Sequence, residues 1–115
     1  MAYCFEFLSD DFNFETVDEI VNNFFDQNPH SWPCWAFSNH DATRIASRVN
    51  KSPKEIMGKL LSLRGNVCIY QGEELGLRNS ILEKKDIRDP FGLNFWPKFK
   101  GRDGCRTPLP WNSCL

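Results

Sequence analysis

A chain of 115 residues, with 41% hydrophobic and 14% aromatic residues, can bury one modest core, so we expect a single folding unit. Its 14 Lys and Arg residues nearly balance 15 Asp and Glu residues and are scattered along the chain, which argues against nucleic acid as a partner. No stretch approaches the roughly 20 apolar residues of a membrane span, so no membrane association is expected.

The first predicted elements are a strand and a helix. Residues 2–8 are aromatic-rich and are followed by the turn-prone residues 9–11, which is typical of a strand that ends in a polar loop. Residues 14–28 then repeat apolar side chains at helical period, with Asn13 as the expected cap. This is the strongest periodicity in the sequence.

A second strand is predicted over residues 35–38, entered through Pro33. It ends in the polar cluster 39–41, which places these polar residues just past the carboxyl end of a strand. Residues 44–49 form a candidate short helix. A firm helix follows over residues 53–64, since Ser52 and Glu55 form a capping-box pair with Pro at the first helical position.

The third predicted strand, residues 67–70, is a continuous apolar run that ends in a second polar cluster, residues 71–74. Strands separated by helices pair in parallel, so the loops after the strands gather at one edge of the sheet. We therefore expect an α/β unit over residues 1–77. Residues 78–115 lose this periodicity and are predicted to form one long loop rich in aromatic residues, Pro and Gly.

The five cysteines are odd in number and irregularly spaced, which indicates neither a closed disulfide framework nor a metal knuckle. We expect four of them to be buried thiols and the fifth, next to the carboxyl terminus, to be exposed. They are Cys4, Cys34, Cys68, Cys105 and Cys114. The acidic pair at residues 10–11 follows the start too closely for a secretory apolar region, so a cytoplasmic location is expected.

Two polar groups carry the candidate chemistry: residues 39–41 with Arg44, and the pair Glu73-Glu74. Both follow predicted strands and so share one edge of the sheet. Adjacent His40 and Asp41 can hydrogen-bond vicinal hydroxyls, and an ionised Asp can stabilise positive charge developing on a sugar carbon. The structural alternative is that Asp41 caps the following helix while His40 is a satisfied, semi-buried imidazole.

Other chemistries fit the residues less well. A His-Asp metal pair needs further ligands, and the only other histidine is His30 in a predicted loop, so no metal and no cofactor is expected. A nucleophilic pair of Cys34 and His40 would have its members at opposite ends of one short segment. Side chains of adjacent Glu73 and Glu74 point in different directions, so at most one faces a pocket.

Three segments resemble motifs of the alpha-glucosidase branch of the alpha-amylase superfamily (glycoside hydrolase family 13). Residues 32–41, with Arg44 three positions further on, resemble its fourth conserved region, residues 69–76 its strand-eight motif and residues 101–111 the signature after that strand. They read WPCWAFSNHD, IYQGEELG and GRDGCRTPLPW. The order and spacing of the three also agree with the family.

The resemblance implies a partial (β/α)8 TIM barrel, about strands six to eight with their helices and the long loop after strand eight. Asp41 would then be the carboxylate that binds sugar hydroxyls and stabilises the transition state, and His40 would bind hydroxyls of the terminal glucose. Arg44 would orient Asp41 or the substrate. The implied substrates of the full-length enzyme are alpha-glucosides of the maltose or isomaltose type.

The resemblance also implies that the nucleophile and general acid of retaining hydrolysis come from strands four and five, which these residues do not match. We therefore expect a fragment that is inactive alone, and we expect no substitute pair among Asp10, Asp11, Glu73 and Glu74. The alternatives are a non-catalytic module that complements a separate barrel fragment, self-association through open strand edges, or a decayed remnant without function.

Overall fold

The computed structural model describes residues 2–112, which form an α/β structure around a three-stranded parallel sheet. The strands are β1 (Ala2–Cys4), β2 (Pro33–Trp35) and β3 (Asn66–Val67), in the order β1-β2-β3. The predicted α/β class with parallel pairing is therefore confirmed. The register aligns Cys4 with Trp35 and Trp35 with Val67.

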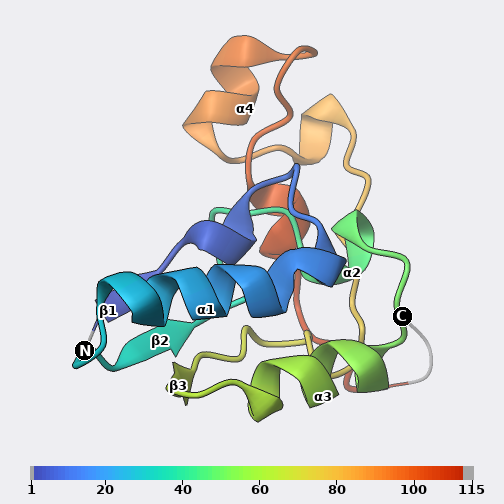
Figure 1. Cartoon of the computed structure of the whole chain (residues 1–115). Helices are drawn as coiled ribbons and strands as arrows, with labels where there is room; N and C mark the ends of the chain where they lie inside the picture. The colour runs from blue at the N-terminus through green and yellow to red at the C-terminus, as the bar shows by residue number, and fades with distance from the viewer. Residues whose placement is uncertain (1, 113–115) are drawn as a thin grey trace.

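Helices form the crossovers between the strands (Figure 1). A 3-10 turn (Phe14–Thr16) leads into α1 (Val17–Gln27), and the predicted cap is confirmed, since the Asn13 side chain accepts a hydrogen bond from the backbone N–H of Glu15 at 3.1 Å. The second crossover holds the single turn α2 (Ile45–Arg48) and α3 (Pro53–Ser62).

The amino terminus of α3 carries the capping box expected from the sequence. The backbone N–H of Glu55 donates to the Ser52 hydroxyl, while the Glu55 carboxylate accepts from the backbone N–H of Ser52. Gly65 follows the helix with φ 132°, and a β-carbon there would lie 2.8 Å from the carbonyl oxygen of Pro33. Only glycine lets this turn pack against the start of β2.

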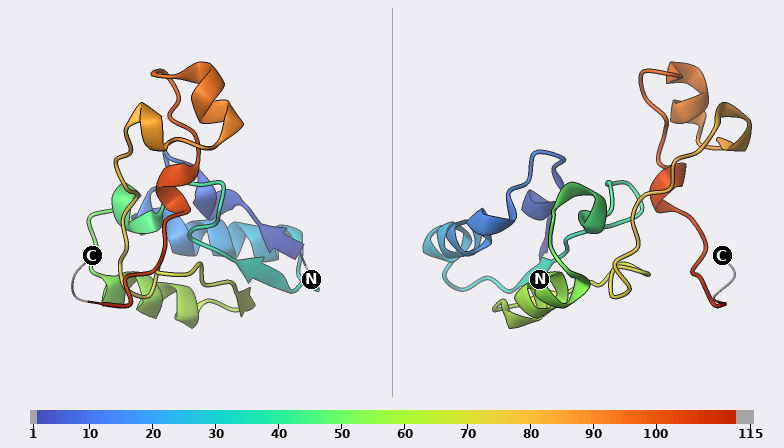
Figure 2. Two further views of the ribbon diagram at one scale, coloured as in Figure 1. Left: turned by 180° about the vertical axis from the view of Figure 1, so that it is seen from behind. Right: turned by 90° about the vertical axis from the view of Figure 1, so that its right-hand side faces the viewer.

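The core lies between the sheet and the helices α1 and α3 (Figure 2). Register partners Cys4 and Trp35 are both buried on this side, where they pack with Val21 of α1 and Leu60 of α3. The opposite side carries Tyr3 and its register partner Cys34, which are more exposed. One face of the sheet is thus covered by helices and the other is open.

The strands are shorter than the sequence suggests. The segment 2–8 is a strand only to Cys4 and then turns through a 3-10 helix (Glu6–Leu8), and β3 ends at Val67. Within the described residues both β1 and β3 are edge strands with one neighbour each, so few ladder bonds hold them extended. The ladder continues for one more bond, from the N–H of Cys68 to the carbonyl of Trp35 at 2.8 Å.

Residues 78–112 form a segment, called the excursion below, that projects from the body of the structure (Figures 1 and 2). It is not without structure, because short helical turns interrupt the predicted loop: Lys84–Asp86, α4 (Pro90–Phe95) and Asp103–Cys105. Pro90 opens α4, with Asp89 as its cap. The chain returns to the body at the turn around Cys105, whose carbonyl accepts a hydrogen bond from the Tyr70 hydroxyl at 2.9 Å.

Two of the cysteines, Cys4 and Cys105, are buried, whereas Cys34 is half-buried and Cys68 exposed. The expectation of four buried thiols was therefore too high, because Cys34 and Cys68 lie on the uncovered side of the sheet. Cys114 lies outside the described residues. Across residues 2–112 no helix has the length and apolar character needed to cross a membrane.

Candidate functional site

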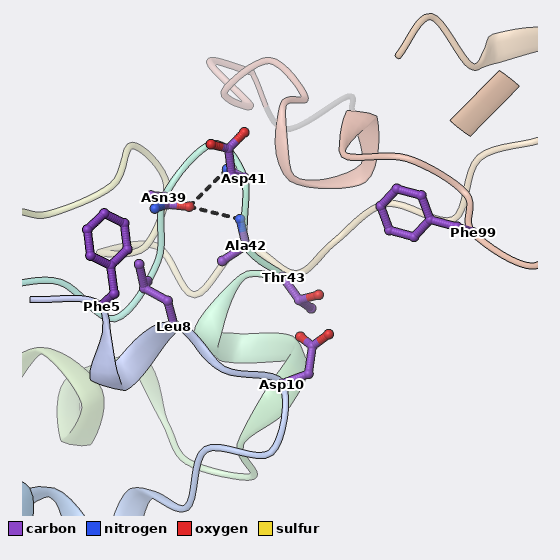
Figure 3. A pocket seen from close by; sticks show the side chains of 8 residues that line it. All are labelled: Phe5, Leu8, Asp10, Asn39, Asp41, Ala42, Thr43 and Phe99. Atoms are coloured by element: carbon purple, nitrogen blue, oxygen red, sulfur yellow. Dashed lines mark hydrogen bonds between the residues drawn. The ribbon is translucent and has the colours of Figure 1, made fainter. Parts of the chain in front are cut away.

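A tight turn after β2 presents the predicted site residues. The Asn39 side-chain oxygen accepts hydrogen bonds from the backbone N–H groups of Asp41 at 2.9 Å and Ala42 at 2.8 Å (Figure 3). This is the local capture of backbone donors that favours Asn in turns. It fixes the direction of the chain at the carboxyl end of the sheet and turns the Asp41 side chain outward.

The Asp41 carboxylate is held by two arginines from the far end of the chain. Its Oδ1 accepts hydrogen bonds from Arg102 Nη1 and from Arg106 Nη2, each at 2.9 Å, and its Oδ2 lies 3.4 Å from His40 Nε2. Taken alone, the reduced contact of Asp41 with water would raise the pKa of its carboxyl group. The hydrogen bond from Arg102 and the attraction of His40 outweigh this effect, so the pKa lies below its ordinary value.

Arg106 also fixes the backbone beside the carboxylate. Its Nε donates to the carbonyl oxygen of His40 at 2.7 Å, and the Cys105 thiol is 3.4 Å from the same oxygen. The His40 imidazole itself is exposed, with 69% of its side-chain surface accessible. The structure therefore brings His40 and Asp41 together, and it does so with His40 open to a ligand and not as a semi-buried core residue.

Arg44 lies elsewhere. It is buried, its Nη1 donates to the carbonyl of Gln71 at 2.7 Å, and its guanidinium lies 4.8 Å from the ring centre of Tyr70. Among residues 2–112, none of its hydrogen bonds or ion pairs reaches Asp41. Arg44 joins the loop after β2 to the turn after β3, while Arg102 and Arg106 hold the carboxylate, so any influence of Arg44 on Asp41 passes through the backbone.

The adjacent glutamates of the second polar cluster differ in burial, because their side chains point in different directions. Glu73 is buried and accepts a hydrogen bond from the backbone N–H of Tyr70 at 3.3 Å, while Glu74 is exposed. Burial raises the pKa of Glu73, although a hydrogen bond from Ser38 partly opposes the shift. The position of Glu73 inside the turn makes it a support of the sheet edge.

Asp41 lies where two hollows meet. One, of about 280 Å³, is drawn in Figure 3, and the other, of about 420 Å³, continues onto the open face of the sheet. The first is lined by Phe5, Leu8, Asp10, Asn39, Asp41, Ala42, Thr43 and Phe99. The second adds Tyr3, Ser38, His40, Cys68, Ile69 and Tyr70. Both mix aromatic surface with a few polar groups, which is the kind of lining that small-molecule sites have.

No metal site competes with this interpretation in the part of the chain that the structure describes, where three or more His, Cys, Asp or Glu side chains nowhere come together to hold an ion. The Asp41 carboxylate also does not cap α2, whose capping position is Arg44 without a side-chain bond. The sequence does not indicate Arg102 and Arg106, which lie within the motif at residues 101–111, as partners of Asp41. They lie 61 and 65 positions from Asp41 in the sequence, and helix and strand periodicities relate only residues that are close in sequence.

The family described as the catalytic domain of alpha amylase matches residues 5–114. Curated relatives include a probable alpha-glucosidase of Rhizobium meliloti (strain 1021), 49% identical over 98% of this chain and 22% of its own length. Another is maltase A1 of Drosophila melanogaster, 31% identical over 98% of this chain and 21% of its own length. The chain thus spans about a fifth of the length of these relatives.

Solved structures agree with this match. The alpha-glucosyl transfer enzyme XgtA superimposes with a TM-score of 0.86 at 44% identity, over 96% of this chain and 22% of the other. The trehalose-6-phosphate hydrolase of Bacillus licheniformis superimposes with a TM-score of 0.77 at 26% identity, over 96% of this chain and 26% of the other. The similarity covers the sheet, its helices and the excursion together, and it supports the predicted partial barrel.

Proposed function

The chain belongs to the alpha-amylase catalytic-domain family, and from that premise we propose that it forms one side of an alpha-glucosidase active site. In this proposal it supplies strands six to eight of the barrel and one of three catalytic carboxylates, Asp41. The complete enzyme cleaves terminal alpha-glucosidic bonds, with maltose- or isomaltose-type oligosaccharides as substrates. Relatives named as a maltase and as an oligo-1,6-glucosidase support both linkage types.

One observation carries the proposal: an ionised carboxylate is held by two arginines at the carboxyl edge of a parallel sheet, next to an exposed imidazole. Cleavage of a glycosidic bond passes through a transition state with positive charge on the sugar ring. The arginines bind Oδ1 and keep Asp41 ionised, so its Oδ2, which faces His40, can stabilise that charge and accept hydrogen bonds from ring hydroxyls. His40 contributes a donor or acceptor for a neighbouring hydroxyl, and Arg44 acts through the backbone it holds.

Hydrolysis with retention needs two further carboxyl groups about 5–5.5 Å apart, a nucleophile and a general acid. The family resemblance assigns both to strands outside these 115 residues. We therefore propose that the chain alone does not turn over substrate and that it acts only with the rest of a barrel.

The proposal is tested with a graft, defined as the Rhizobium meliloti relative with its matching segment replaced by residues 1–115 of this chain. Release of nitrophenol from p-nitrophenyl alpha-glucoside is measured for the graft and for the chain alone. We expect a folded, active graft and background rates for the chain alone. Turnover by the chain alone, or a folded graft without activity, contradicts the proposal.

A second candidate function is a complementing module that binds a separate amino-terminal barrel fragment. The outer edges of β1 and β3 have no strand partner in the described residues, and Phe5 and Ile69 are exposed beside the open face. Co-expression with a fragment carrying strands one to five tests this: a stable complex supports it and separate elution rejects it. Self-association would appear as a dimer in the same experiment, and a decayed remnant would show no cooperative unfolding.

A further inference from the structure

A buried carboxylate in the excursion binds the arginine that holds Asp41. The Asp89 side chain has no accessible surface. Its Oδ2 accepts hydrogen bonds from the backbone N–H and the Nε of Arg102, both at 2.8 Å, and its Oδ1 accepts from Arg102 Nη2 at 3.1 Å. The pair is therefore bidentate, the geometry that makes arginine–carboxylate contacts strong and directional.

The remaining arm of the same guanidinium reaches the candidate site. Arg102 Nη1 donates to Asp41 Oδ1 at 2.9 Å while Nε and Nη2 are engaged by Asp89. A guanidinium is planar and rigid, so fixing two of its nitrogens also fixes the direction of the third. The Phe91 ring lies 5.5 Å from the guanidinium carbon and limits its movement further.

The backbone around Asp89 is itself built to hold this contact. Asp103 Oδ2 accepts hydrogen bonds from the N–H groups of Arg88 at 2.7 Å and Asp89 at 2.8 Å. Gly101 has φ 79°, and a β-carbon there would lie 3.0 Å from the β-carbon of Asp89. Two segments of the excursion, around residues 89 and 101, thus touch at a point where a side chain would separate Asp89 from Arg102.

We propose that Asp89 is a positioning residue for the active site, which sets the orientation of Asp41 through Arg102. This rests on the proposed function, because it matters only if Asp41 meets substrate. Without Asp89, the Arg102 side chain, 31% exposed, samples several rotamers, and the donor to Asp41 has to be ordered anew for each substrate. With Asp89 the donor is in place before substrate arrives, which is the preorganisation that electrostatic catalysis requires.

The test uses the graft and its Asp89→Asn variant. Asparagine keeps the shape of the side chain, but its amide N–H₂ faces the donors of Arg102, so the bidentate contact is lost. Glu83→Gln is the control, because it removes one negative charge from an exposed site of the same excursion. Arg102→Ala and the double variant Asp89→Asn/Arg102→Ala complete a cycle of steady-state rates, with melting temperatures measured for each protein.

We expect Asp89→Asn to lower kcat/KM about tenfold or more, mainly through kcat, while Glu83→Gln stays at the parent value. In the Arg102→Ala background, Asp89→Asn should cause no further loss, because its effect passes through Arg102. If kcat/KM of Asp89→Asn equals that of Glu83→Gln, the inference is overturned. It is also overturned if the kcat/KM losses of Asp89→Asn and Arg102→Ala multiply in the double variant.

Two further measurements keep the test decisive. If Asp89→Asn does not fold, Arg102→Lys replaces it, since a lysine at this surface position reaches one carboxylate only; unchanged kcat/KM in that folded variant overturns the inference. If the folded graft is inactive, the proposed function fails separately, and the pKa of Asp41 is read by carbon NMR of aspartate-labelled graft. Asp89→Asn must then raise that pKa and Glu83→Gln must leave it unchanged.

Discussion

Arg48 donates hydrogen bonds to both ends of the loop at residues 37–43, which carries Asp41, and replacing Arg48 tests whether these bonds keep the loop closed. Its Nε donates to the carbonyl of Thr43 at 2.8 Å and its Nη1 to that of Phe7 at 2.9 Å, while Nη2 donates to the carbonyl of Phe37. Phe37 precedes the loop and Thr43 follows it. Arg48→Met removes these bonds and the second hydrogen bond of Nη1, with a side chain of comparable length that has no donor.

The size of the effect follows from the contacts. Opening the loop breaks the two bonds to Phe37 and Thr43, whose carbonyls are partly buried, and a net contribution of about 1–1.5 kcal/mol for each bond gives a loss of about 2–3 kcal/mol in the free energy of opening. Since about 1.4 kcal/mol corresponds to a factor of ten, the backbone amides of Asp41 and Ala42 should exchange with solvent about thirty- to a hundredfold faster.

Hydrogen exchange followed by mass spectrometry on the graft measures this change in the peptide that contains residues 37–43. Arg88→Met is the matched control, because the Arg88 side chain is exposed. Exchange in Arg48→Met that equals the control would refute the idea that Arg48 closes the loop. Faster exchange spread evenly over the whole chain would refute it too, since the bonds of Arg48 are local.

Three further changes test other contacts. Ser52→Ala removes the capping box of α3 and should lower the free energy of unfolding by about 1 kcal/mol, whereas Ser62→Ala at the other end should change little; equal melting temperatures for the two would contradict this. Because the pKa of Glu73 is raised in the folded protein, the folded state loses stability as pH rises above about 4.3. The gain in melting temperature from Glu73→Gln should therefore grow with pH, and a gain that stays constant with pH would contradict this expectation. Arg106→Gln should raise the pKa of Asp41 toward its ordinary value, and an unshifted carbon NMR titration would exclude the proposed ion pair.

Local patterns predicted the helices and their caps well. The apolar period around Val17 and Val21, the Asn13 cap and the capping box at Ser52 depend on residues within one or two turns of each other, and the structure contains all of them. Strand lengths were less predictable, because a strand ends where its partner leaves the ladder. That point depends on the neighbouring segment and not on the strand itself.

The site was predictable in part. The position of Asp41 after a strand followed from the order of elements and from the motif around it, and so did its closeness to His40. The partners of Asp41 did not follow, since Arg102 and Arg106 come from an excursion without period, folded back through Asp89 and Gly101. Arg44 is closer to Asp41 in sequence, but its buried guanidinium donates to the Gln71 carbonyl and lies over the Tyr70 ring.

We propose that this chain contributes an ionised, substrate-facing carboxylate to a glucosidase site. Asp41→Asn in the graft tests it most directly, with Asp26→Asn on the exposed side of α1 as the control. We expect kcat/KM for p-nitrophenyl alpha-glucoside to fall at least about a hundredfold in Asp41→Asn, while both variants melt at the parent temperature. Parent-like turnover by a folded Asp41→Asn graft would contradict it.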